Sequence, residues 1–204
     1  MPLSVSSPEN VINLALVRIG FKGRVNSIYE GSEASKLALD IYSQTRDELL
    51  RQSDWGFAER NVPLTLQKQA PAGGYIPPLY WTSIYPALPW FFQYGYPQDC
   101  LKIRALKPTP LFIPNFDPQT NVFTVANDNS FTPAQKVILC NVPLAILTYT
   151  AQVTDMTTWE ADFVETFVSS IARRLAPSLV GLDTAKLEAS DEAAAKAQAE
   201  MEQG

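Results

Sequence analysis

The sequence contains no histidine. Histidine is the most frequent general base near neutral pH and the most frequent protein ligand of zinc. Neither a Ser-His-Asp triad nor a Cys-His pair can be assembled from this chain alone. The absence excludes the commonest hydrolytic sites and leaves carboxylate pairs as the acid–base chemistry to consider.

Cysteine and long apolar runs are also scarce. Cys100 and Cys140 are the only two cysteines, so we expect no disulfide framework, and zinc would need at least two further ligands. No apolar run reaches the roughly 20 residues of a membrane-spanning helix. The N-terminus, MPLSVSSPEN, has neither the basic segment nor the apolar segment of a secretory signal. We therefore expect a soluble protein of a reducing compartment, without a membrane segment, metal or cofactor.

Positive charge is not concentrated anywhere in the chain. Residues 183–202 carry six acids and two lysines, whereas the remaining chain carries 15 acids and 14 bases. Neither part has the basic field that drives nucleic-acid binding. With 204 residues, the chain is predicted to form one domain over residues 1–182, followed by an acidic, Ala-rich helical tail over 183–204.

Apolar periodicity and capping residues predict three core helices. They span Pro8–Ile19 with Ser7 as its cap, Glu33–Ser53 with Ser32 as its cap, and Thr158–Val180. Trp55 follows the second helix and is predicted to be a core residue. Within the second helix, Lys36–Asp40 and Asp47–Arg51 are spaced to form ion pairs.

Short strands are predicted between the second and third helices. They are Glu59–Gln67, Cys100–Leu106, Leu111–Pro114, Asn121–Ala126 and the first part of Lys136–Val153, with a turn at 117–120. The expected fold class is α+β. It comprises a helical core of about three helices, an inserted small antiparallel sheet and a C-terminal helical extension.

Residues 68–95 have an unusual composition. Lys68 is their only charged residue, eight residues are aromatic, and five are prolines. The prolines argue against both a helix and a central strand, which predicts a long irregular insertion. Its aromatic residues either cover the sheet or form an oligomer or tail interface. The candidate interface residues are Tyr80, Trp81, Tyr85, Trp90, Phe91 and Phe92.

The last segment, about Thr184 to Gln203, has high helix propensity but almost no large apolar residues. It is either a solvated tail or a docking element that becomes ordered on assembly, and we favour docking. The candidate docking residues are Ala185, Leu187, Ala189, Ala193 and Met201.

Other candidate sites have simpler structural explanations. Glu30 and Glu33, and the set Glu160, Asp162 and Glu165, are the carboxylates that a glycosidase would need. We expect the first two to cap and charge the start of the second helix, and Asp99 to accept a turn hydrogen bond. For Arg60, Lys102, Arg104 and Lys107 we favour a solvated strand face over DNA contact. Gly73-Gly74 is expected to form a turn, since it lacks the lysine and helix of a phosphate loop.

Three patches together resemble a known family. The first patch comprises Ser27-Ile28-Tyr29-Glu30, Ser32-Glu33-Ala34, Tyr42, Arg46-Asp47-Glu48-Leu49-Leu50, Trp55 and Phe57-Ala58-Glu59-Arg60. The second comprises Pro89-Trp90 and Tyr94 to Leu101. The third comprises Tyr149 to Asp155 and the Ala-rich helix ending near Leu179. In order and spacing they resemble the head-to-tail adaptor proteins of short-tailed bacteriophages. The resemblance covers most of residues 8–180.

The resemblance implies a virion structural protein and no enzyme. Such proteins form a ring, usually of about twelve copies, between the portal at the capsid vertex and the tail. The implied partners are the portal protein, tail proteins and other copies of the chain, with DNA passing through the ring without sequence-specific binding. The implied location is the portal vertex of the virion, after synthesis in the host cytoplasm.

Three alternatives remain. Tail-tube ring proteins share part of the second-helix pattern, so the ring is alternatively at another level of the tail. A cell-wall glycosidase using a carboxylate pair is a second alternative. A host-derived interaction module is the third, although it would leave the match across three patches unexplained.

Overall fold

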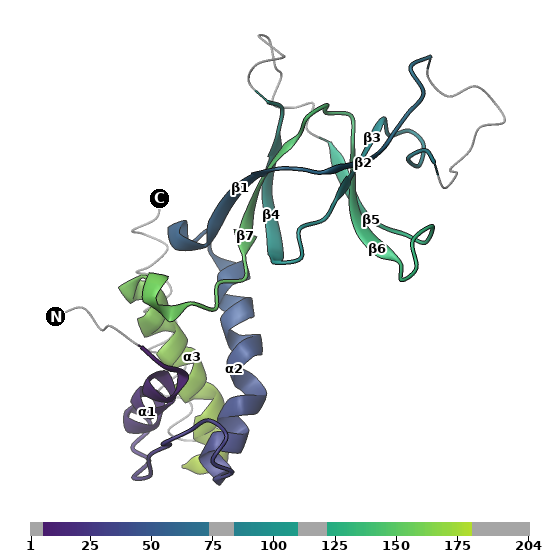
Figure 1. Cartoon of the computed structure of the whole chain (residues 1–204). Coiled ribbons are helices and arrows are strands. Elements are labelled where there is room, and N and C mark those ends of the chain that lie inside the picture. Colours follow the sequence, from purple (N-terminus) through teal and green to yellow (C-terminus); the bar gives the residue numbers. More distant parts are fainter. Residues whose placement is uncertain (1–5, 74–83, 110–121, 181–204) are drawn as a thin grey trace. The chain divides into compact units, whose positions relative to one another are not determined.

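The computed structural model describes residues 6–73, 84–109 and 122–180 (Figure 1). These residues form an α+β fold with three α-helices and two small antiparallel sheets. The chain divides into two compact units. The helical unit contains the described residues up to Ala58 and those from Gln152 onward, and the sheet unit spans Glu59–Ala151. The segment predicted as one domain, 1–182, therefore contains a sheet unit inserted between two helices.

The first helix, α1, spans Pro8–Arg18. Ser7 caps it as predicted, because its hydroxyl accepts a hydrogen bond from the Asn10 amide, and Pro8 occupies the first turn, where no amide donor is needed. Val11, Ile12, Ala15 and Leu16 are fully buried. The apolar stripe of α1 thus faces the core of the helical unit.

The second helix, α2, spans Glu33–Gln52 and is capped by the Ser32 hydroxyl, as predicted. Its buried face follows the predicted periodicity, with Ala34, Ala38, Thr45 and Leu49 inside. A 3-10 turn, η1, at Gly56–Ala58 leads into the sheet unit.

The third helix, α3, spans Ala161–Leu179 and begins three residues later than the predicted start at Thr158. A 3-10 turn, η3, at Met156–Thr158 includes the predicted first residue, Thr158, and the Asp155 side chain caps this turn. Pro177 lies in the last turn of α3. The helix packs against both α1 and α2.

The sheet unit contains the following strands: β1 (Glu59–Pro63), β2 (Leu66–Gln69), β3 (Phe92–Gly95), β4 (Cys100–Lys107), β5 (Phe123–Asp128), β6 (Gln135–Cys140) and β7 (Ile146–Ala151). Among the described residues, sheet A has the order β1-β7-β4 and sheet B the order β2-β3-β6-β5, with all pairs antiparallel. The central strands β6 and β7 carry most of the buried aliphatic side chains.

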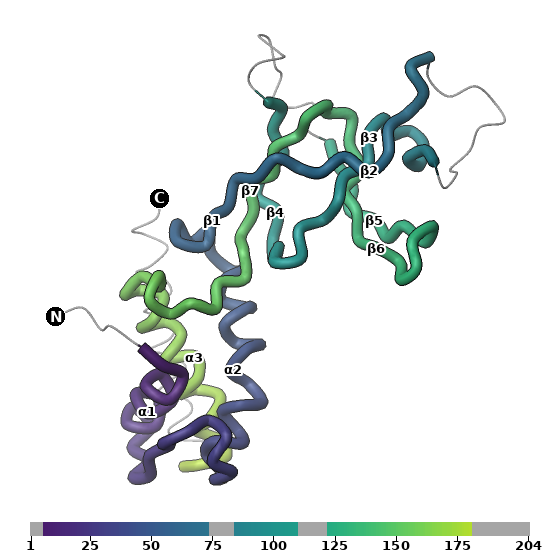
Figure 2. The backbone as a smooth tube through the Cα atoms, viewed as in Figure 1, coloured from purple at the N-terminus to yellow at the C-terminus, as the bar shows by residue number. Residues whose placement is uncertain are grey.

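Along the sequence the chain passes between the two sheets four times (Figure 2): from β1 to β2, from β3 to β4 and from β4 to β5, before it returns from β6 to β7. The predicted single strand Glu59–Gln67 is wrong, because Leu64 and Thr65 separate β1 in sheet A from β2 in sheet B. The Leu64 amide still donates to the Ala145 carbonyl at 2.9 Å, and the Thr65 carbonyl accepts from the Gly95 amide at 3.0 Å. The crossing therefore keeps its backbone groups paired. The return crossing passes Leu144, which has a left-handed φ of 49°.

The prediction that residues 68–95 are irregular is wrong at both ends. Lys68 and Gln69 belong to β2, and Phe92–Gly95 forms β3, an interior strand of sheet B. All five prolines of this stretch precede β3, so they do not interrupt its pairing. The predicted strand Leu111–Pro114, the turn at 117–120 and the helix at 184–203 lie outside the described residues.

Candidate interaction surfaces

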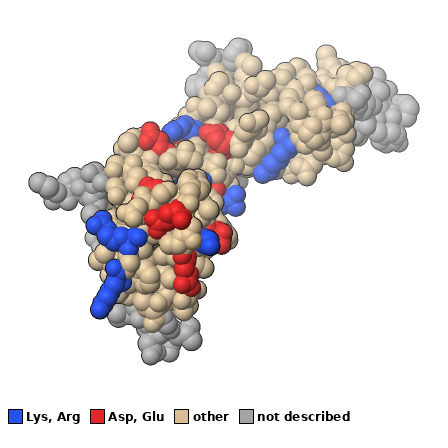
Figure 3. All heavy atoms as spheres, turned by 60° about the horizontal axis from the view of Figure 1, so that its bottom comes forward, with Lys and Arg blue, Asp and Glu red and all other residues tan. Residues whose placement is uncertain are grey.

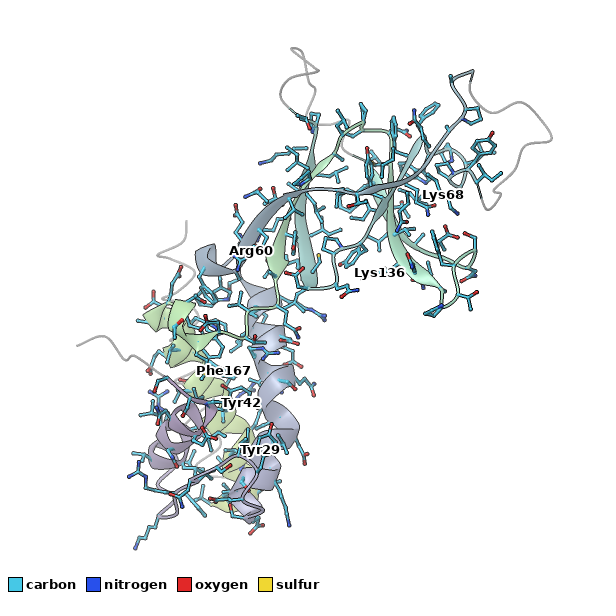
Figure 4. All side chains as sticks on the ribbon, in the orientation of Figure 1. Tyr29, Tyr42, Arg60, Lys68, Lys136 and Phe167 are labelled. Carbon is cyan, nitrogen blue, oxygen red and sulfur yellow. The ribbon has the colours of Figure 1, made fainter. Side chains whose placement is uncertain are left out.

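The loop Val25–Ser32 holds a single exposed aromatic side chain in a fixed hydrogen-bond frame. Both carboxamide atoms of Asn13 bond to the backbone of Val25 at 2.8 Å. Glu30 Oε2 accepts from the Asn26 and Ser27 amides at 2.9 and 3.3 Å, and Glu30 Oε1 accepts from the Ser32 hydroxyl at 2.7 Å. Tyr29 lies within this frame and is 80% exposed (Figure 4).

The contacts of Glu30 correct one expectation. Its side chain fixes the loop before α2 and does not cap the helix itself, which begins one turn later with Ser32 as its cap. Hydrogen bonds from Ser32, Asn26 and Ser27 lower the pKa of Glu30. A lowered pKa is the opposite of what the general acid of a glycosidase requires.

The aromatic corner after α2 builds the core of the helical unit. Trp55 is 2% exposed, and its indole Nε1 donates to the Leu49 carbonyl at 3.0 Å. Its ring meets that of Phe163 edge to face, with centroids 5.2 Å apart. Farther along α3, Phe167 makes an edge contact with Tyr42 at 5.1 Å (Figure 4). The prediction that Trp55 is a core residue is confirmed.

Charged residues of the family-like patch join the three helices. Arg18 on α1 bonds to Glu165 and Ser169 on α3, and Arg174 on α3 bonds to Glu48 on α2. Asp47 pairs with its neighbour Arg46 at 2.8 Å. Glu48 and Glu165 therefore have structural partners.

Glu160 and Asp99 also have structural partners. Glu160 Oε1 accepts from the Phe57 amide at 3.2 Å, so it ties the corner to α3. Asp99 Oδ1 accepts from the Tyr149 hydroxyl at 2.9 Å, in place of the predicted turn bond. Burial, together with Asp99, raises the pKa of Tyr149 to about 12.

Sheet B contains a buried ion pair that the sequence analysis missed. Lys68 Nζ bonds to Asp128 Oδ2, and both side chains are almost fully buried (Figure 4). Gln93 Nε2 donates to the same carboxylate oxygen at 2.6 Å, and Ser130 Oγ lies 2.8 Å from Lys68 Nζ. The signal was present in the sequence, since a lone lysine in an uncharged, aromatic segment requires a partner if it is buried.

Burial alone would raise the pKa of Asp128. Hydrogen bonds from Lys68, Gln93 and Ser130 outweigh that effect and hold the pKa well below its usual range. Asp128 is therefore ionised in the folded protein at any physiological pH, and the pair with Lys68 is a fixed structural element of sheet B.

The predicted interface aromatics are only partly exposed. Tyr85, Trp90 and Phe92 are half-buried, Phe91 is 45% exposed, and Tyr80 and Trp81 lie outside the described residues. Phe92 stacks with Tyr94 at a centroid distance of 6.2 Å, which favours the sheet-covering alternative for that ring.

Exposed apolar side chains lie on the segments that lead into β3 and β5 of sheet B. They are Ile84 (69% exposed), Leu88 and Phe91 before β3, and Val122 (63% exposed) before β5. The Phe91 amide donates to the Asn141 side chain at 2.9 Å. Val122 precedes Phe123, which pairs with Cys140, so Phe91 and Val122 approach the same end of β6 from either side. We call these four residues the sheet B apolar end.

The basic strand residues are not uniformly solvated. The Arg104 side chain is only 10% exposed, pairs with Glu59 Oε2 at 3.0 Å and donates to Thr150 Oγ1 at 2.9 Å. The expectation of a solvated face is therefore wrong for Arg104, because it lies along β7 in sheet A. Lys107 is exposed. On the face shown in Figure 3, Lys, Arg, Asp and Glu residues are scattered among uncharged residues.

Cys100 and Cys140 are both buried within strands, as their predicted strands required, and they form no disulfide. Burial raises the pKa of Cys140 to about 11, which makes it an unreactive thiol. Among the described residues, no group of three or more His, Cys, Asp or Glu side chains is placed to hold a metal ion. Nor is any helix in the described ranges long and apolar enough to cross a membrane.

The candidate docking residues Ala185, Leu187, Ala189, Ala193 and Met201 lie outside the described residues. The chain matches no protein-family model and no curated protein sequence.

Proposed function

We propose that this chain is a virion structural protein of a short-tailed bacteriophage that forms a ring between the portal and the tail. In that role it extends the DNA channel and helps to retain the packaged genome. The chain works by assembly, with no catalytic residue, cofactor or metal. The main support is the match of three sequence patches to head-to-tail adaptor proteins.

One structural observation carries the assembly role. The sheet B apolar end exposes four large apolar side chains, three of which lie within residues 69–98, a stretch without a charged residue. Protein interfaces have apolar, aromatic centres that are depleted in charge. Isolated exposed apolar residues are ordinary, but a group of them at one strand end favours a partner contact.

The contacts made by residues of the family-like patches are a second observation that supports a structural role. Glu30, Glu48 and Trp55 each make contacts that fix the loop, the helix pairing or the core of the helical unit. Such residues stabilise the fold and are not placed for chemistry, as we expect in a protein that functions through its shape and its surfaces. We propose residues 183–204 as the docking element for the portal or a neighbouring copy, with the candidate residues named above.

Electron microscopy of particles made by the parent virus with this gene interrupted tests the proposal. We expect heads that have no attached tail and have lost their packaged genome, because the ring that closes the portal is missing. Supplying the intact gene in trans should restore tailed particles. Normally tailed, full particles from the interrupted gene would contradict the proposal. Particles that carry an incomplete tail on the head would instead indicate that the ring belongs to another level of the tail.

A further inference from the structure

A polar cleft lies on the sheet unit beside the point where the chain leaves β3. Its volume is about 590 Å³, and its lining includes Gln67, Gln98, Gln135, Lys136, Tyr96 and Pro133. This is within the size range of protein binding sites, which combine apolar walls with a few convergent polar groups. We call it the glutamine cleft.

A chain of hydrogen bonds fixes the carboxamides of this cleft. It starts at buried Asp128, whose Oδ2 accepts from Gln93 Nε2 at 2.6 Å. Gln93 Nε2 also donates to Gln67 Oε1 at 3.3 Å, and Gln67 Nε2 donates to Gln135 Oε1 at 3.3 Å. Gln93 uses its amino group for both of its bonds, whereas Gln67 and Gln135 each accept through Oε1 from the previous amide. The chain therefore ends at the Nε2 amino group of Gln135, which carries two donors. The buried carboxylate thus sets which end of each amide faces the cleft.

Lys136 adds a positive charge to the lining of the cleft. Its Nζ lies 3.9 Å from the centre of the Tyr96 ring, a cation–π contact that holds the side chain against the cleft wall (Figure 4). Within the described part of the chain, the cleft lining contains this one lysine and no acidic residue. Asp99 is the acid nearest in sequence to the lining, and its Oδ1 accepts a bond from Tyr149. The cleft is therefore rich in donors, on a chain whose net charge is −5.

We propose that the glutamine cleft binds a carboxylate carried by an Asp or Glu side chain of another polypeptide. Amide and ammonium donors bind carboxylate oxygens through short, charge-assisted hydrogen bonds. A polypeptide suits the site better than a small acid, because a second hollow of about 250 Å³ adjoins the cleft. The two share Gly95, Tyr96 and Pro97, and the second is lined by Val62, Pro63 and Leu64. A segment with an acidic residue and a neighbouring apolar residue would occupy both.

The test is titration of the full-length, isotope-labelled chain with three probes, followed by NMR chemical shifts. The probes are a blocked peptide of Gly, Glu and Leu residues, the same peptide with Gln in place of each Glu, and an oligogalacturonate as an acidic saccharide. We expect the Glu peptide to shift the resonances of Tyr96, Gln135 and Lys136, and the Gln peptide to bind more weakly by roughly tenfold. Binding should weaken as salt is raised.

Two variants and a control locate the contact. Lys136→Gln and Gln135→Ala should each weaken the Glu peptide several-fold without changing the fold, since both positions are exposed. Lys107→Gln removes an exposed lysine of the same sheet unit that does not line the cleft, and it should bind normally. Any of three results would overturn the proposal: the Glu and Gln peptides bind equally well, the affinity for the Glu peptide falls equally in Lys136→Gln and Lys107→Gln, or no peptide binds at millimolar concentration. Tighter binding of the oligogalacturonate would show that the cleft recognises a saccharide, which also overturns it.

Discussion

At the scale of single residues, the buried side chains of each unit have defined partners. Trp55 combines an edge contact with Phe163 and an indole hydrogen bond to Leu49, so its loss removes both packing and a satisfied donor. Tyr29, by contrast, is almost fully exposed although its backbone is held by the loop. Trp55 and Tyr29, both in the family-like patches, should therefore have different effects on stability when they are changed.

Trp55→Ala should lower the free energy of unfolding by roughly 3–5 kcal/mol, because it opens a large cavity in the helical unit. Chemical denaturation of the purified variant measures this directly. Tyr29→Ala is the matched control, and it should change stability by less than about 0.5 kcal/mol. A Trp55→Ala protein as stable as the parent would show that the indole is not part of the core.

The Lys68–Asp128 pair predicts how stability depends on pH. The pKa of Asp128 is lower in the folded chain than in the unfolded chain, so the unfolded state binds a proton first. The stabilisation is fully present above the ordinary aspartate pKa of about 3.9 and is lost as the pH falls below it, toward the folded pKa. Asp128→Asn should lack this component, so its unfolding free energy should fall less steeply with acid than that of the parent.

Breaking the same pair at neutral pH should be costly. Removing one member of a buried ion pair leaves the other charge unpaired, which typically costs about 3–5 kcal/mol. We expect that loss for Asp128→Asn, and recovery of most of it in Lys68→Met/Asp128→Leu, where no charge remains buried. Denaturation midpoints that order the single variant above the double variant would contradict this account.

At the scale of elements, the two ends of the inserted unit lie together. β1 opens the unit and β7 closes it, and Glu59 pairs directly with Thr150. Residues in such antiparallel pairs have Cα atoms about 5 Å apart. The chain therefore leaves and re-enters the helical unit at nearly the same place, so the helices do not depend on the insertion for their connection.

Replacing residues 60–149 by a short Gly/Ser linker should leave a folded helical unit. Its core of α1, α2 and α3, with Trp55, Tyr42 and Phe163 inside, lies entirely outside the removed segment. We expect a cooperative thermal transition and a helical circular dichroism spectrum. A molten spectrum without a transition would show that the helices need the sheet unit to fold.

The proposal that residues 183–204 are a docking element can be tested by truncation. Truncation after Leu182 should leave the folding transition unchanged, because every described helix and strand of both units lies before that point. Binding of the truncated chain to portal rings, measured by co-sedimentation, should be much weaker than that of the full chain. Binding of equal strength would show that residues 183–204 are only a solvated appendage.

The elements differ in how far the sequence could predict them. Ser7, Ser32 and the apolar periodicity of α2 are local signals, and they located the helix starts to within a residue. The division of Glu59–Gln67 between two sheets depends on pairing with β7 and β3, which lie far away in sequence, so no local pattern contains it. The lone Lys68 indicates that a partner is needed, but its partner Asp128 lies 60 positions away, so no local pattern identifies it.

At the scale of the whole molecule, the account rests on assembly. The near-neutral body, the sheet B apolar end and the resemblance to head-to-tail adaptors all favour a protein that functions by contact with copies and partners. A specific contact of this kind should bury more than about 1,000 Å² between neighbours. Ile84→Ser with Phe91→Ser should weaken such a contact and leave the folding transition in place, because both side chains are exposed.

Native mass spectrometry of the chain, alone and mixed with the portal ring of its own virus, tests the central claim most directly. We predict that the chain alone is a monomer or small oligomer. With the portal we predict a single complex that contains a fixed number of copies of the chain, equal to one complete ring. The Ile84→Ser/Phe91→Ser variant should form that complex less completely. A chain that stays monomeric in the presence of the portal and every tail component would contradict the account.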